Sequence, residues 1–315
     1  MIDRDDDLLW VEKYRPRKIV ECILPERIKS IFQSIVDSKE LPNLLLHGSS
    51  GTGKTTVARA LCNELGVDYI IINGSQDGNI DTLRTRIKSF ASTVSLAGNR
   101  KAVILDESDF LNPTSTQPAL RGFIEEFSAN CRFIFTCNYP AKILPAIHSR
   151  CSVISFSTNK KEQTELAKQL FTRISNILKS EKVEFEKTDV AVGIQRHLPD
   201  FRRIINEFQS KSHSGQLKSV DTGSTIDYGL AELIPLLSAK DFTKLRKWAA
   251  TYASQDSAST YSQIYRHLET HGEVPAGKLA QAILITDDFD RQHSFCADPE
   301  IHLSAFLLTI AMEVF

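Results

Sequence analysis

The stretch GSSGTGKTT, Gly48 to Thr56, is the most informative segment of this chain. The apolar run Leu44–His47 before it is short enough to be a buried strand, and Val57–Cys62 after it resumes at helical spacing. A G-x-x-x-x-G-K-T segment between a strand and a helix is typical of a P-loop, which holds nucleotide phosphates. A chance turn rich in Gly, Ser and Thr is the alternative, and the strand and helix signals on both sides argue against it.

The residue types within this stretch match the parts of a nucleoside triphosphate. Glycines let the backbone curl so that consecutive N–H groups converge on phosphate oxygens at the positive end of the following helix. Lys54 would reach the β- and γ-phosphates as a positive charge, and the Thr55 hydroxyl would bind Mg²⁺. The predicted ATP-binding residues of the loop are Gly51, Thr52, Gly53, Lys54, Thr55 and Thr56.

Composition bounds the class of protein that surrounds the loop. A chain of 315 residues is expected to form about two or three domains, and its 42% hydrophobic content supplies ordinary globular cores. Lys and Arg number 38 against 39 Asp and Glu. Because the two charges balance, any contact with nucleic acid would need a local basic face.

Cysteine usage and the termini predict the cellular setting. The six cysteines form no C-x-x-C pair, which favours reduced, buried thiols without disulfides or zinc. Met1–Asp7 is acidic where a signal peptide would be basic and then apolar. The longest apolar tract, near Leu303–Phe315, is too short to span a bilayer. We therefore expect a soluble, cytoplasmic protein without membrane contact.

Strand and helix signals divide the chain into an α/β part and an all-α part. Short β-rich runs alternate with helical stretches, which predicts a mostly parallel sheet covered by helices. These runs are Leu44–His47, Tyr69–Asn73, Ala102–Asp106, Phe133–Thr136 and Val153–Phe156. Beyond Ser157 only helices are expected, at Lys160–Lys182, Asp189–Ser212, Leu230–Leu237, Asp241–Ser254, Ser257–His271, Lys278–His293 and Ile301–Phe315, with a polar linker at His213–Gly229.

The predicted domains are a nucleotide-binding core at 1–156, a small helical lid with the linker at 157–229, and an all-α domain at 230–315. No internal repeat is visible at any period. In a sheet of this kind, ligands gather at the carboxyl ends of the strands.

Two further strands are expected to carry polar groups to that edge. Lys101–Glu107 is an apolar run that ends in adjacent carboxylates, where Asp106 would hold Mg²⁺ and Glu107 would polarise the attacking water. Asn138 follows the next apolar run and could hydrogen-bond the γ-phosphate and the lytic water. A solvated acidic turn and a turn-forming Asn are the alternatives.

Further motifs stand at Trp10–Pro16, Asp106-Glu107-Ser108-Asp109, Ser149-Arg150-Cys151 and Pro199–Arg203. Together with the P-loop and Asn138, these motifs resemble those of the AAA+ ATPases of the sliding-clamp-loader family. The resemblance covers nearly the whole chain, and Glu21–Pro25 and His302–Glu313 are most similar to the large loader subunits of T4-type bacteriophages. Similarity to the small subunits of replication factor C is also evident.

The resemblance implies a P-loop AAA+ domain, a lid and a C-terminal collar that joins subunits, in a pentameric hetero-oligomer. Arg150 would then be a trans arginine finger, inserted into the ATP site of a neighbouring subunit. A structural Arg that caps a helix is the alternative.

Arg202 resembles the lid arginine that contacts the γ-phosphate, and Arg203 is the less favoured candidate. Val11, Glu12, Lys13, Tyr14 and Ile23 would surround the adenine, although Trp10 and Tyr14 could simply pack an N-terminal arm onto the core.

The family's partners are sliding clamps, primer–template DNA and other loader subunits, at replication forks in the cytoplasm, which for a phage is the host's. Arg84 and Lys88 lie one turn apart on a predicted helix and could follow template phosphates, although a solvated helix would also carry such a pair.

The implied function is ATP-driven loading of the clamp. A silent scaffold subunit, a polypeptide-threading ring and a helicase-type motor are the rivals. The complete set of ATPase residues argues against the first, and the lack of an aromatic-apolar-glycine pore loop between Thr56 and Lys101 argues against the second.

Overall fold

The computed structural model describes residues 9–76, 80–93, 100–212, 215–217, 225–253, 260–271, 274, 276–293 and 295–315. The acidic stretch Met1–Asp7 lies outside these residues. The chain divides into two compact units, Met1–Val220 and Asp221–Phe315. Within the described ranges, no helix has the length and apolar character needed to cross a bilayer.

The first unit is built on five parallel strands in the order β2-β3-β4-β1-β5. The strands are β1 (Leu44–His47), β2 (Tyr69–Asn73), β3 (Lys101–Asp106), β4 (Cys131–Cys137) and β5 (Ser152–Ser155). All five runs that the sequence predicted as strands are strands. Because β3, β4 and β1 are neighbours and parallel, their carboxyl ends meet at one edge of the sheet.

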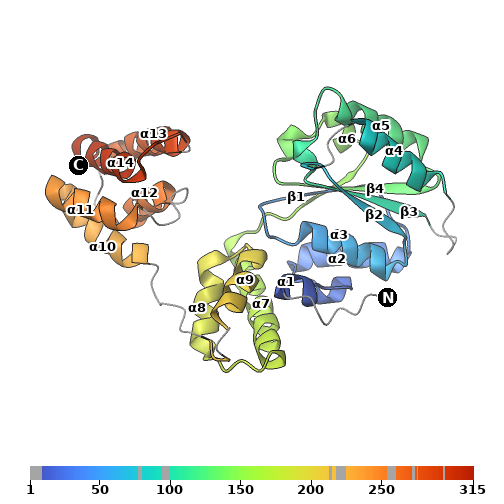
Figure 1. The fold of residues 1–315 in the computed structure, drawn as a ribbon, viewed down its shortest axis with the longest axis horizontal. Helices are drawn as coiled ribbons and strands as arrows, with labels where there is room; N and C mark the ends of the chain where they lie inside the picture. The colour runs from blue at the N-terminus through green and yellow to red at the C-terminus, as the bar shows by residue number, and fades with distance from the viewer. Residues whose placement is uncertain are drawn as a thin grey trace. The chain divides into compact units, whose positions relative to one another are not determined.

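Helices cover both faces of this sheet (Figure 1). Helices α2 (Glu26–Ser38) and α3 (Lys54–Glu64) lie on one face, and α4 (Ile80–Ala91), α5 (Thr116–Glu126) and α6 (Pro145–His148) lie on the other. The side chains of β1 alternate between two apolar clusters, one on each face of the sheet. Leu44 and Leu46 pack in the same cluster as Phe32, and Leu45 packs in the same cluster as Leu83. Three short 3₁₀ helices, η2 (Ile19–Glu21), η3 (Ser108–Phe110) and η4 (Pro140–Lys142), complete the core.

A three-helix lid follows the sheet, formed by α7 (Lys160–Ser180), α8 (Lys187–His197) and α9 (Phe201–Lys211). Asn159 and Glu162 form a capping box that starts α7. The prediction of one helix over Asp189–Ser212 was wrong. Pro199 has no N–H to continue a helix, and the Asp200 side chain accepts the N–H of Arg203 and starts α9 anew.

The second unit consists of helices, as predicted: α10 (Thr225–Ser238), α11 (Phe242–Tyr252), α12 (Thr260–His271), α13 (Ala276–His293) and α14 (Pro299–Glu313). Helix α10 begins inside the stretch 213–229 that was predicted as a linker. Gly229 lies there because of packing, since an added Cβ would lie 2.6 Å from the Tyr252 hydroxyl. Its carbonyl also accepts the indole N–H of Trp248 at 2.8 Å. The glycine that suggested a linker is therefore a helix-packing residue.

Candidate functional site

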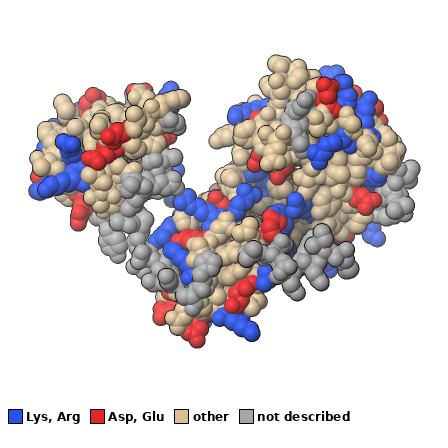
Figure 2. Space-filling view, in the orientation of Figure 1, with Lys and Arg blue, Asp and Glu red and all other residues tan. Residues whose placement is uncertain are grey.

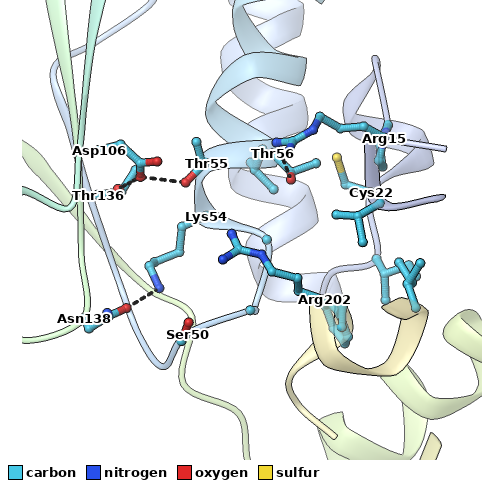
Figure 3. A pocket seen from close by; sticks show the side chains of 18 of the residues that line it. Arg15, Cys22, Ser50, Lys54, Thr55, Thr56, Asp106, Thr136, Asn138 and Arg202 are labelled. Atoms are coloured by element: carbon cyan, nitrogen blue, oxygen red, sulfur yellow. Dashed lines mark hydrogen bonds between the residues drawn. The ribbon is translucent and has the colours of Figure 1, made fainter. Parts of the chain in front are cut away.

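A pocket of about 1070 Å³, which includes space open to solvent, lies at the carboxyl ends of β1, β3 and β4. The P-loop forms its floor, the N-terminal arm forms one wall, and the first turn of α9 contributes from the lid (Figure 3). Its lining includes Val11, Tyr14, Ile23, Gly51, Gly53, Lys54, Thr55, Thr56, Asp106, Glu107, Asn138 and Arg202.

The P-loop backbone presents donors to this pocket. Gly51 and Gly53 have φ values of +74° and +88°, which residues with a Cβ rarely adopt. Gly53 also precedes α3, whose first intrahelical bond runs from Val57 N to Gly53 O at 2.8 Å. The N–H groups of the first turn therefore lack intrahelical acceptors and suit an anion. Thr52 is buried and faces its own loop, since its hydroxyl donates to Ser49 O at 2.9 Å.

Lys54 places a buried positive charge within the loop. Its Nζ donates to Gly48 O and Ser49 O, both at 2.8 Å, and to Asn138 Oδ1 at 2.9 Å (Figure 3). Only 8% of the residue is exposed, and burial lowers the pKa of Lys54 from its ordinary value. All three acceptors are uncharged, and among the described residues no carboxylate contacts this ammonium. An anion in the pocket would therefore meet a positive charge that no contacting group neutralises.

The acid pair follows β3. Thr55 Oγ1 donates to Asp106 Oδ1 at 2.7 Å, and Thr136 Oγ1 donates to the same oxygen (Figure 3). Glu107 adopts a left-handed conformation with φ +52°, and its N–H donates to Thr136 Oγ1 at 3.3 Å. A hydroxyl and a carboxylate this close together are the hard oxygen donors that Mg²⁺ prefers, so the residues fit that ion.

Asp109 fixes the segment that carries Asn138. Its Oδ2 accepts the backbone N–H groups of Asn138 and Tyr139, both at 3.2 Å. Its Oδ1 is buried and has no hydrogen-bond partner among the described residues. Asn138 is therefore held by its backbone while its side chain faces Lys54 and the pocket.

The N-terminal arm, α1 (Trp10–Lys13) and the residues after it, forms the side of the pocket assigned to adenine. Tyr14 lines it and donates to Glu181 Oε1 at 2.6 Å; burial and this carboxylate raise the pKa of Tyr14 to about 12. Lys13 Nζ lies 2.9 Å from the same carboxylate, and Glu12 pairs with Arg15. Neither Glu12 nor Lys13 lines the pocket.

The lid contacts the P-loop directly. Phe201 N donates to Gly51 O at 3.1 Å, and Arg202 lines the pocket. Trp10, which could have packed on the core, belongs instead to the apolar cluster of the lid. Its backbone N–H donates to Gln209 Oε1 at 2.9 Å. Arg203 does not line the pocket.

The contact between the lid and the P-loop can be tested by substituting Gly51. A Cβ on Gly51 would lie 1.8 Å from Asp200 Oδ1, whereas a Cβ on Gly53 would have no neighbour within 4 Å. We expect Gly51→Ala to weaken ATP affinity about tenfold or more, because it adds a clash with the α9 cap to about 1–2 kcal/mol of backbone strain. Gly53→Ala, the matched control, carries the strain alone and is expected to weaken binding less. Equal losses in a titration with a fluorescent ATP analogue would contradict this role of Asp200.

The remaining predicted residues lie outside the pocket. Arg150 Nε and Nη2 donate to Glu125 Oε1 at 2.9 and 2.5 Å, which lowers the pKa of Glu125, and Nη1 donates to Ala146 O at 2.8 Å. Arg84 and Lys88 are exposed on α4, one turn apart. The structure therefore does not bring these three cations to the chain's own ATP pocket.

Several residues that line the pocket were missed by the sequence analysis. Arg15 donates to Thr56 Oγ1 at 3.4 Å, and it belongs to the same N-terminal motif that identified Tyr14. Thr136 stands two residues before Asn138, and a hydroxyl in an apolar strand was the available signal. Arg173 reaches the arm from the middle of α7, where its donation to Tyr14 O could not be foreseen from the sequence.

Comparison with known proteins agrees with this geometry. Residues 44–159 match the family model of the ATPase family associated with various cellular activities (AAA). The chain is 34% identical over 310 residues to the sliding-clamp-loader large subunit of Enterobacteria phage T4, which covers 96% of this chain and 95% of that protein. It is 33% identical to the replication factor C small subunit of Sulfolobus acidocaldarius, with 98% and 97% covered.

The solved structures support the fold alone. A mutant of RuvB from Thermotoga maritima superposes with a TM-score of 0.56 over 83% of this chain and 93% of that chain, at 18% identity. Identity above 30% over nearly the full length of both chains is the stronger observation, and it holds for phage and archaeal relatives alike. The chain therefore belongs to the sliding-clamp-loader family of AAA ATPases.

Proposed function

We propose that this chain is the ATPase subunit that loads a sliding clamp onto primer–template DNA, with Mg²⁺ and ATP bound in the pocket described above. The buried Lys54 ammonium carries the proposal, because its three uncharged acceptors leave it free to neutralise phosphate. Gly51, Thr52, Gly53, Thr55 and Thr56 would supply the loop around the phosphates, and Val11, Tyr14 and Ile23 the apolar wall for adenine. Glu12 and Lys13 would contribute through their backbone.

The residues of the pocket divide the work of hydrolysis. Thr55 and Asp106 would hold Mg²⁺, which when bound neutralises charge on the phosphate oxygens. Glu107 would orient and polarise the attacking water. Asn138, whose side chain accepts a hydrogen bond from Lys54, would hydrogen-bond both that water and the γ-phosphate. Arg202, at the start of α9, would tie the lid to the γ-phosphate.

Arg150 would complete the site of an adjacent subunit. Its position outside its own pocket, partly exposed on the segment before β5, supports a role in trans. The guanidinium fork that now holds Glu125 would match the charge on a transferred phosphoryl group. Turnover would then depend on assembly, with domains at 1–156, 157–229 and 230–315 serving as core, lid and oligomerising collar, in a hetero-oligomer that resemblance makes pentameric.

Helix α4 would contact the DNA backbone. Leu83 and Ile87 are buried against the sheet, so Arg84 and Lys88 face outward. Lys and Arg side chains gather over α4 and α5 on the face shown in Figure 2. Phosphate contacts of this kind position a duplex without selecting its sequence.

Charge reversal tests the DNA contact. Arg84→Glu/Lys88→Glu is expected to remove most of the DNA stimulation of ATPase activity, and to lower the slope of log affinity against log salt by about 2. Nucleotide affinity should not change, because neither residue lines the pocket. A double reversal of two exposed lysines on α7, Lys161→Glu/Lys168→Glu, is the matched control. Unchanged stimulation in the α4 variant would discard the assignment.

The function as a whole is tested by ATPase assays of the purified chain with partner subunit, clamp and primed DNA, added singly and together. We expect low turnover alone and the highest turnover with all three. An isolated, monomeric chain that hydrolyses ATP at its maximal rate, and responds to neither clamp nor DNA, would refute the proposal.

A further inference from the structure

Thr136, at the end of β4, touches both adjacent acids of the pocket through one hydroxyl. Its Oγ1 donates to Asp106 Oδ1 and accepts the backbone N–H of Glu107 at 3.3 Å (Figure 3 shows the first bond). The residue is 1% exposed. A hydroxyl has a single proton, so Thr136 gives it to the Asp106 carboxylate and accepts the backbone N–H of Glu107 with a lone pair.

A polar side chain at this point of β4 needs an explanation. Thr136 pairs with Leu46 of β1 and follows Phe133, Ile134 and Phe135, all of them buried. A buried hydroxyl without a partner costs stability, so an apolar residue would suit the strand better. The two hydrogen bonds to the acid segment account for threonine here.

We propose that Thr136 is a positioning residue that fixes both carboxylates of the ATPase site, an inference that rests on the roles given above to Asp106 and Glu107. Thr55 is the second donor to Asp106, but its hydroxyl is also the one assigned to Mg²⁺. Binding of Mg²⁺ would use a lone pair of the Thr55 oxygen and leave its proton for Asp106. Thr136 is therefore the donor to Asp106 that has no assigned contact with the metal.

The second bond fixes the direction in which Glu107 leaves the strand. Glu107 has φ +52°, a conformation that costs free energy for a residue with a Cβ. The bond from its N–H to Thr136 stabilises that turn, and Glu107 lines the pocket. Loss of the hydroxyl would therefore loosen the metal ligand and the water-polarising group together.

The experiment compares Thr136→Val, which replaces the hydroxyl by a methyl group of similar size, with Thr136→Ser, which keeps the hydroxyl. For the full chain, affinity for a fluorescent ATP analogue is measured in EDTA and in Mg²⁺. The kcat and KM for ATP are measured with partner subunit, clamp and primed DNA present. For Thr136→Val we expect affinity in EDTA within about twofold of wild type, a gain from Mg²⁺ reduced about fivefold or more, and kcat reduced about tenfold or more at a nearly unchanged KM. Thr136→Ser should recover most of both losses.

Thr286→Val is the matched control, because that buried hydroxyl donates to Ala282 O at 2.7 Å in the second unit. It should leave the Mg²⁺ gain and kcat unchanged. If Thr136→Val does not fold, Thr136→Ala, which makes no steric demand, carries the same expectation. A valine or alanine variant with wild-type kcat and Mg²⁺ gain would overturn the inference alone, as would a serine variant as impaired as valine. A wild-type chain that gains no affinity from Mg²⁺, and hydrolyses no ATP even with partner subunit, clamp and primed DNA present, would overturn the proposed function, and this inference with it.

Discussion

Lys54→Ala is expected to lower ATP affinity by at least about 100-fold, because it removes two charge-assisted contacts with the β- and γ-phosphates that are worth about 1.5–3 kcal/mol each. The unfolding midpoint without nucleotide should remain close to that of wild type. Folding removes the Lys54 ammonium from water at a cost, as its lowered pKa shows, and its three hydrogen bonds offset that cost. Titration with a fluorescent ATP analogue, beside a thermal melt, measures both quantities.

A second buried lysine provides the control. Lys101 is 6% exposed and donates to Phe90 O at 3.2 Å, but it lies at the amino end of β3, away from the pocket. Lys101→Ala is expected to lower stability and to leave ATP affinity within about twofold of wild type. If the two variants lost affinity equally, the loss would reflect general damage to the core, and the phosphate role of Lys54 would be wrong.

Arg150→Ala is expected to leave ATP affinity unchanged and to reduce clamp- and DNA-stimulated hydrolysis about 1000-fold, the scale of an arginine finger. The reason is geometric: the guanidinium lies outside its own pocket and holds Glu125. Arg150→Lys keeps the charge but loses the planar fork, so it should restore only part of the rate. Arg100→Ala, an exposed arginine beside the amino end of β3, is the control and should keep full stimulation.

Mixing two inactive chains separates action in trans from action in cis. Lys54→Ala chains retain Arg150 but lack a working pocket, whereas Arg150→Ala chains retain the pocket. In mixed assemblies some sites would pair an intact pocket with an intact finger, so the mixture should exceed the summed activity of the two variants measured separately. A mixture with no more activity than that sum, formed under conditions where the chains assemble, would contradict a finger supplied by the neighbour.

The sheet and the residues at the centre of the pocket could be predicted from local sequence patterns. Buried parallel strands are continuous apolar runs, so β1 and β2 begin and end where predicted, and β3, β4 and β5 differ by three residues or fewer at each end. Lys54, Thr55, Asp106, Glu107 and Asn138 meet in one pocket because each lies at or after the carboxyl end of a strand of the same parallel sheet. Local pattern was enough to place them, since parallel strands bring their carboxyl ends to a common edge.

The contacts between segments far apart in the chain could not be predicted from the sequence and became visible in the folded structure. Gly51 meets Asp200 across 149 positions of sequence (51 to 200), Arg173 reaches the N-terminal arm, and Arg150 turns toward Glu125 rather than toward its own pocket. Helical spacing shows which side of a helix is apolar, but it does not show which distant segment that side or its polar neighbours will meet. Those pairings depend on how lid and core pack together, and packing is a property of the whole fold rather than of any local stretch.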